Sequence, residues 1–141
     1  MRGDQHLLNS ESEPLTNLII GCALRVHTAL GPGLLESAYS ESLVVELSEN
    51  GLEFEREVPL KVHYHGRALP VGYRLDLVVR RAVVVEVKSV DKLAPVHSAQ
   101  LLSYLRLGGY DRGLLLNFGE FRLRDGIKRI VNGWKAPERS G

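Results

Sequence analysis

The sequence predicts an α/β domain in which a mixed central β-sheet is flanked by helices. Apolar residues recur at helical spacing over 15–30, and they alternate with polar residues over 58–64. Two nearly continuous apolar runs, 82–88 and 113–118, are separated by a segment with helical spacing. Two buried strands joined by a helix are typical of a parallel pair with a crossover connection, so the sheet combines parallel and antiparallel strands.

Composition sets the class of protein. The chain has 141 residues, 44% of them hydrophobic and 25% charged, which suits one globular domain. The net charge of +1 predicts no strong global attraction to polyanions, so any such site must be local. No window approaches the length of a membrane span. The single cysteine, Cys22, cannot form an internal disulfide, which favours a cytoplasmic location.

Two helices are predicted in the first third of the chain. Pro14 suits a first helical turn, and the helix that follows runs to about Leu30, where Gly31-Pro32-Gly33 stops it. A second helix is predicted over 35–49, with Asn50-Gly51 as its cap. The polar ends are predicted to be flexible, which gives tails over 1–13 and 133–141 and a single domain over 14–132.

The remaining elements follow a change of period from helical to alternating. Three strands are expected to form an antiparallel meander, because short turns separate them. The strands are predicted over residues 58–64, 71–79 and 82–88. A helix over 95–107, a fourth strand over 113–118 and a short closing helix over 125–131 follow.

Acidic residues interrupt two of the buried strands. Asp76 lies in YRLDLVV and Glu86 in VVVEVK, and the Arg80-Arg81 turn makes these strands adjacent. A turn centred there places the two carboxylates opposite one another, where each raises the pKa of the other. A divalent cation between the two would explain such a pair, since Mg²⁺ prefers oxygen ligands.

Lys88 lies two residues after Glu86 and therefore points to the same face of the strand. A lysine beside a metal site can orient a water or neutralise a phosphate. The alternative is a Glu–Lys ion pair on an exposed face, which the apolar run 83–87 disfavours.

A polar stripe is predicted on the helix over 95–107. Gln100 and Tyr104 are four residues apart and share a face, which His97 joins. This stripe either lines a cleft or is solvated, and for His97 the two alternatives are equally favoured. On the strand before the acidic pair, Arg74 shares a face with Asp76 and either pairs with it or meets a phosphate.

These residues resemble a known family. An aspartate followed by Glu-x-Lys on the next strand is the signature of the PD-(D/E)xK nuclease superfamily, and GLLESAY at 33–39 reads G-x-x-E-x-x-Y. The latter resembles the small bacterial and archaeal family named after that motif. The similarity covers roughly Leu15 to Val131, through RVHTALGPGLLE, VPLKVHYHG, YRLDLVV, VVEVKSV, HSAQLLSYL and GLLLNFG. It implies a restriction-endonuclease-like core with the element order ααβββαβ.

The resemblance also implies roles for individual residues. Asp76 matches the principal metal-bridging aspartate, Glu86 and Lys88 match the Glu-x-Lys pair, and Glu36 matches a helix-borne acid that completes the metal shell. All four are thereby implied in catalysis, with Mg²⁺ or Mn²⁺ as the metal. The resemblance implies nucleic acid as the substrate and favours DNA over RNA.

Further residues are assigned to substrate and support. Gln100 and Tyr104 match the Q-x-x-x-Y motif of RecB-type exonucleases, in which both face the active site. Substrate-binding candidates are Gln100, Tyr104, Arg74 and His97, and supporting candidates are Tyr39, which follows Glu36 by one turn, and Gly33, in the corner that aims it.

Three functions therefore stay open. The first is a metal-dependent nuclease, and the second is a non-catalytic module that binds nucleic acid or protein and keeps a vestigial or regulatory metal site. The third is a structural subunit of an oligomer. Small size and near-zero net charge favour the module, and both a homodimer and a larger complex are compatible with the sequence.

Overall fold

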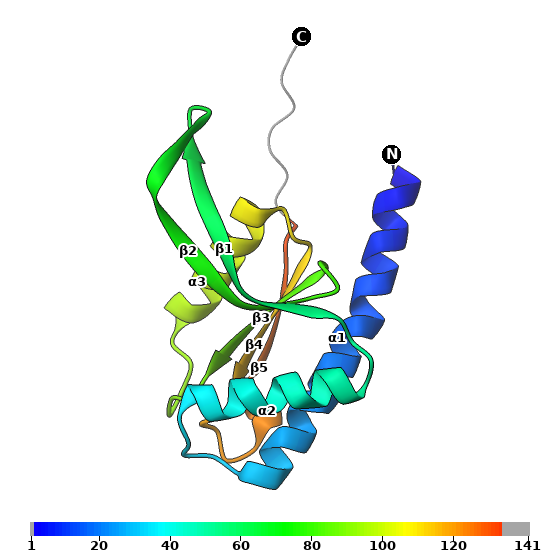
Figure 1. The fold of residues 1–141 in the computed structure, drawn as a ribbon, viewed down its shortest axis with the longest axis vertical. Helices are drawn as coiled ribbons and strands as arrows, with labels where there is room; N and C mark the ends of the chain where they lie inside the picture. Colours follow the sequence, from blue (N-terminus) through cyan, green and yellow to red (C-terminus); the bar gives the residue numbers. More distant parts are fainter. Residues whose placement is uncertain (1, 134–141) are drawn as a thin grey trace.

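The computed structural model describes residues 2–133 as helices and strands around one central sheet (Figure 1). In chain order the elements are α1 (Arg2–Leu30), α2 (Glu36–Glu49), β1 (Phe54–Tyr64), β2 (Arg67–Val79), β3 (Val83–Lys88), α3 (Pro95–Gly108), β4 (Arg112–Asn117), the 3₁₀ turn η1 (Leu123–Gly126) and β5 (Ile127–Val131).

The sheet is mixed, as the sequence predicts, with strand order β1-β2-β3-β4-β5. The first three strands form an antiparallel meander, and β4 pairs parallel to β3 after the α3 crossover. β3 and β4 are buried along almost their whole length, because they are central and covered on both faces.

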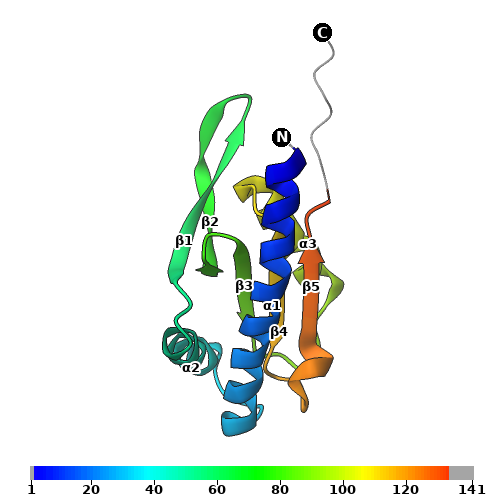
Figure 2. The same cartoon turned by 90° about the vertical axis from the view of Figure 1, so that its right-hand side faces the viewer.

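Helices cover both faces of the sheet. α1 and α2 lie on one side of it and α3 on the other (Figures 1 and 2). Alternate residues of β3 divide between the two cores: Val83, Val85 and Val87 pack with α1 and α2, whereas Val84 packs with α3. The face on which a β3 side chain lies is therefore known from its position in the strand.

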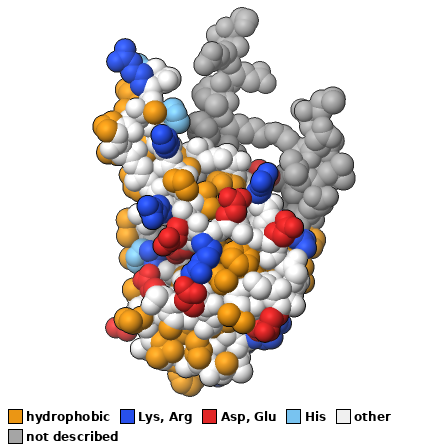
Figure 3. Space-filling view, in the orientation of Figure 1, with side chains coloured by type: hydrophobic (Ala, Val, Ile, Leu, Met, Phe, Trp, Pro, Cys, Tyr) orange, Lys and Arg blue, Asp and Glu red, His pale blue; other side chains and the backbone are white. Residues whose placement is uncertain are grey.

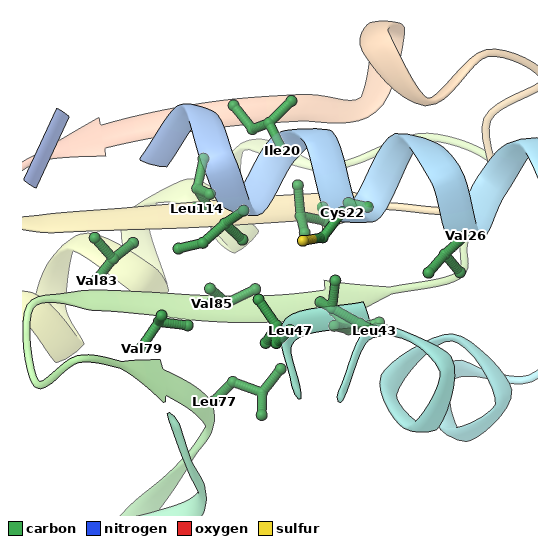
Figure 4. Packing of buried hydrophobic residues seen from close by; sticks show 14 of the residues in the cluster. Ile20, Cys22, Val26, Leu43, Leu47, Leu77, Val79, Val83, Val85 and Leu114 are labelled. Carbon is green, nitrogen blue, oxygen red and sulfur yellow. The ribbon is translucent and has the colours of Figure 1, made fainter. Parts of the chain in front are cut away.

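The larger core packs α1 and α2 against the strands (Figure 4). Cys22 is 1% exposed within it, among side chains such as Leu43, Leu114 and Val85. Burial raises the pKa of the Cys22 thiol. This thiol is therefore a packing group rather than a reactive one.

The β1–β2 hairpin extends beyond the rest of the sheet, and we call residues 58–75 the arm; its lower part packs on α3 through Val58, Leu60 and Leu75, and its upper part projects (Figures 1 and 2). At its base, Leu75 packs in the α3 core, but Leu77 packs in the α1–α2 core. The strand thus exchanges faces at Asp76. Glu57, which has a left-handed φ of 48°, and Asp76 are the residues missing from the register between Arg56–Leu77 and Val58–Leu75.

The first helix is longer than predicted. α1 begins at Arg2 rather than at Pro14, which lies inside the helix. None of the helices within residues 2–133 has the length and apolar character needed to cross a membrane. The flexible tail over 1–13 and the domain limits of 14–132 stay predictions, and the predicted tail from 133 lies almost wholly outside the described residues.

The predicted closing helix over 125–131 is wrong. These residues form the end of η1 and then β5, which pairs antiparallel with β4 and completes the edge of the sheet. Gly126 allows this close approach, since a Cβ there would lie 2.6 Å from the carbonyl oxygen of Asn117. Hydrogen bonding along the free edge of β4 thereby prevails over the helical spacing of the short segment.

Candidate active site

The site forms where β2 separates from β3. The two strands pair at only three positions, from Val79–Val83 to Leu77–Val85, and then diverge. Two carboxylates fill the opening. The backbone N–H of Asp76 donates to Oε1 of Glu86 at 3.2 Å, and the N–H of Val87 donates to Oδ2 of Asp76 at 2.9 Å. The structure thus brings Asp76 and Glu86 together, and each also satisfies a backbone donor.

The proximity of these acids has an electrostatic cost. Glu86 is 7% exposed, and burial followed by the charge of Asp76 raises the pKa of Glu86 to about 8. A side-chain hydrogen bond with Asp76 acts in the same direction, and the charge of Lys88 opposes it. Without a cation, Glu86 is therefore protonated at neutral pH.

Lys88 lies on the same face as Glu86. Position 84 packs in the α3 core, so positions 86 and 88 also point toward the α3 side. Lys88 is half-buried at the end of β3, and its charge reaches Glu86, whose pKa it lowers. The side chain of Lys88 therefore lies on the same face as Glu86, close enough for its charge to lower the pKa of that carboxyl.

Helix α3 adds a phenol to this face. Tyr104 is 8% exposed, and burial raises its pKa, with further increases from Glu86, Tyr73 and Asp76. A side-chain hydrogen bond from Gln100 lowers that pKa, and the ring of Tyr73 lies 5.1 Å from the ring of Tyr104. Gln100 and Tyr104 thus contact one another on the α3 side of the acidic pair, and Tyr73 is a further neighbour that was not predicted from the sequence.

Asn117 fixes the segment that follows β3, a role that was not predicted from the sequence. It is fully buried beside Lys88 in the strand register. Its Oδ1 accepts from the N–H of Val90 at 2.9 Å and of Gly119 at 3.1 Å, while Nδ2 donates to the Val90 carbonyl at 2.9 Å. A single amide at the end of the apolar run GLLLNF was the available signal.

We expect Asn117→Ala to lower the free energy of unfolding by about 2 kcal/mol, because it leaves three half-buried backbone groups of Val90 and Gly119 without their partner. Urea unfolding measures the change. Asn50→Ala is the matched control: it removes one exposed hydrogen bond, from Nδ2 to the Glu46 carbonyl, and should cost less than about 1 kcal/mol. Equal losses in the two variants would contradict the role assigned to Asn117.

The loop before α2 is fixed to the same end of β3. The Tyr39 hydroxyl donates to the Gly31 carbonyl at 2.5 Å and accepts from the Leu34 N–H at 3.1 Å, and Gly33 has a left-handed φ of 98°. Ser89 Oγ donates to the Leu34 carbonyl at 2.6 Å. Tyr39 and Gly33 therefore shape the loop that leads to Glu36.

Glu36 is exposed at the first residue of α2, and that helix packs on the face opposite Glu86. Among the side chains described, those of residues 13–133, no three His, Cys, Asp or Glu are grouped so that they could hold a metal ion. Glu36 thus does not join Asp76 and Glu86 in this structure, and its role as a ligand stays a prediction.

Two substrate-binding candidates have other contacts. Nδ1 of His97 accepts from the Ala94 N–H at 3.0 Å and caps the start of α3, which favours a structural role. Arg74 lies 3.9 Å from Glu57 in an ion pair whose side chains are both about three-quarters exposed. No contact with Asp76 is seen for Arg74, and substrate binding by either residue stays a prediction.

The donor set fits a hard divalent cation. Mg²⁺ is commonly held by one or two carboxylates, with waters and substrate phosphates completing its shell. Asp76 and Glu86 supply the two carboxylates, and a cation between them would replace the proton that Glu86 otherwise retains. A divalent ion therefore suits these residues without a third protein ligand.

Comparisons with known proteins give a match to a family model. A family model described as "PD-(D/E)XK nuclease superfamily" matches residues 13–130, which include Asp76, Glu86 and Lys88. A solved structure described as "Crystal structure of SSO0001" is 22% identical, covers 90% of this chain and 75% of that chain, and has a TM-score of 0.41. No curated protein matches the chain.

Proposed function

Because the chain belongs to the PD-(D/E)XK nuclease superfamily, we propose that it hydrolyses phosphodiester bonds in nucleic acid, in DNA rather than RNA, with Mg²⁺ or Mn²⁺. The observation that carries the proposal is the pair of buried Glu86 and half-buried Asp76, with Lys88 on the same strand face as Glu86. The mixed sheet with helices on both faces is consistent with a restriction-endonuclease-like core.

The residues divide the chemistry of hydrolysis among them. When bound, the cation would polarise the scissile phosphate and lower the pKa of a coordinated water. Asp76 and Glu86 would hold that cation. Lys88 would orient the attacking water and neutralise negative charge that develops on the phosphate. Its position beside Glu86 on one strand face supports both tasks.

Other residues would position the substrate. Gln100 and Tyr104 form a hydrogen-bonded pair beside the carboxylates and would hold the strand or Lys88. Arg74 would meet a phosphate from the base of the arm. Glu36 would complete the metal shell only after the start of α2 shifts toward the α3 side of the sheet.

A finer family assignment is also proposed. The segment Gly33–Tyr39 reads G-x-x-E-x-x-Y, and Tyr39 and Gly33 shape the loop between α1 and α2. These features support membership of the family named after this motif. We further propose a cytoplasmic location, since Cys22 is the only cysteine and is buried.

The test is cleavage of labelled DNA and RNA, single- and double-stranded, with Mn²⁺ or Mg²⁺ and with EDTA as the blank. We expect metal-dependent cleavage of DNA, and a loss of about 100-fold in Lys88→Gln, the size expected when a charge-stabilising donor is removed. Arg81→Gln removes an exposed positive charge at the β2–β3 turn, at the end of β3 away from Lys88; it is the matched control and should retain full activity. Undiminished cleavage by Lys88→Gln would overturn the role of Lys88.

One observation favours the second candidate, a non-catalytic binding module. Asp76 and Glu86 accept backbone hydrogen bonds at the divergence of β2 and β3, so they have a structural role that needs no metal. Metal-independent binding of nucleic acid by the wild type, without cleavage under any of these conditions, would establish this candidate instead.

A further inference from the structure

The arm concentrates positive charge in a protein that is otherwise nearly neutral. Residues 58–75 contain Lys61, Arg67 and Arg74, and no aspartate or glutamate, whereas the whole chain has 18 basic and 17 acidic residues. All three basic side chains are exposed. In Figure 3 the upper part of the arm shows blue, pale blue and orange side chains, while the red ones gather below it.

The charge follows the arm from its base to its tip. Arg74 lies opposite Pro59 near the base, Lys61 lies opposite Gly72 in the middle, and Arg67 follows the turn at the tip. At about 3.3 Å per residue, the distance from Arg74 to Arg67 is roughly 20 Å. This length exceeds the ~12 Å width of the major groove of B-form DNA, so the charges can reach the backbones that flank it.

We propose that the arm binds double-stranded DNA by inserting into the major groove and contacting the flanking phosphates. The inference rests on the proposed function in that nucleic acid is taken as the partner. The base of the arm leads directly to the site, because Arg74 is two residues from Asp76 on β2. Its ion pair with Glu57, at 3.9 Å and highly exposed, is weak and does not compete with a phosphate.

The geometry favours a DNA duplex over the other polyanions and over a second copy of the chain. A two-stranded ribbon fits the major groove of B-form DNA, whereas the deep, narrow groove of an RNA duplex excludes it. Contact between the arms of two copies of the chain is disfavoured, because both arms are positively charged and repel one another.

The experiment measures binding in EDTA, where no cleavage occurs, by fluorescence anisotropy of a labelled DNA duplex over about 50–200 mM salt. The test variant is Lys61→Gln/Arg67→Gln, which leaves the residues of the site intact. The control, Arg80→Gln/Arg81→Gln, removes the same charge at the β2–β3 turn, at the other end of β2. Urea unfolding verifies that both variants are folded.

We expect the slope of log affinity against log salt to fall in magnitude by about 2 in the arm variant, one per lost phosphate contact, and to stay unchanged in the control. An unchanged slope in the arm variant, or an equal loss in the control, would overturn the proposal. An arm-dependent slope of the same size with a matched RNA duplex or single strand would overturn groove insertion.

The outcome is separable from that of the nuclease proposal. If the wild type binds DNA more strongly than the arm variant but does not cleave it with Mn²⁺, the nuclease function is refuted and DNA binding by the arm is supported. If the wild type cleaves DNA with metal and the arm variant binds DNA as the wild type does, the nuclease function is supported and DNA binding by the arm is refuted.

Discussion

Asp76→Asn is expected to lower Mn²⁺-dependent cleavage by at least about 1,000-fold, which corresponds to about 4 kcal/mol of transition-state stabilisation. The change removes one of the two negative charges that would hold the cation. It keeps the shape of the side chain, and an amide oxygen can still accept from the Val87 N–H, now 2.9 Å from Oδ2. The fold should therefore survive while cleavage is lost.

Initial rates with saturating Mn²⁺ measure this effect, and calorimetric titration with Mn²⁺ alone should show weaker binding. Asp111→Asn is the matched control, because Asp111 is exposed beside the end of β4 farthest from Lys88. It should retain wild-type rates and affinity. Cleavage by Asp76→Asn within tenfold of the wild type would refute the proposed metal site.

The stability of the metal-free protein is expected to fall as pH rises from about 4.5 to about 8. Glu86 has an ordinary pKa of 4.5 in the unfolded chain and a pKa of about 8 in the folded state. The folded state therefore keeps a proton that the unfolded state releases, so stability is complete below 4.5 and is lost up to 8. The loss is on the order of 3–5 kcal/mol.

The charges of Asp76 and Lys88 act on Glu86, and the charge of Glu86 in turn raises the pKa of Tyr104. Urea unfolding in EDTA across this pH range measures the loss, which Glu86→Gln should abolish. Glu53→Gln, an exposed glutamate outside the site, should leave the profile unchanged.

Mn²⁺ should restore stability at pH 8, because it binds the deprotonated pair in the folded state only. The restoration should increase with Mn²⁺ concentration and should be absent in Glu86→Gln. A flat pH profile for the wild type would show that Glu86 titrates normally, and a profile insensitive to Mn²⁺ would show that the pair holds no cation.

Much of the architecture could be predicted because local periodicity is strong. The valines of β3 and the leucines of β4 specify central strands, and the interruption of β3 by Glu86 marked the site. The position of Lys88 on the same face as Glu86 followed from strand alternation alone. These predictions needed only backbone geometry and the cost of burying charge.

Other features depend on partners distant in the sequence. The segment 127–131 becomes a strand because β4 offers it a free edge. Asn117 stabilises the segment after β3 because its side chain accepts a hydrogen bond from the backbone of Val90, which is distant in the sequence. The separation of Glu36 from Glu86 arises because α2 packs on the other face of the sheet. Periodicity carries no information about which face a helix covers.

The amino-acid order alone thus determined the four strands β1 to β4, the acidic pair and the lysine, since each follows from burial and alternation within a few residues. Three-dimensional packing decided where β2 leaves β3, how Asp76 and Glu86 share the opening, and how far the arm projects. These outcomes depend on contacts between distant segments, which form only when the whole core assembles.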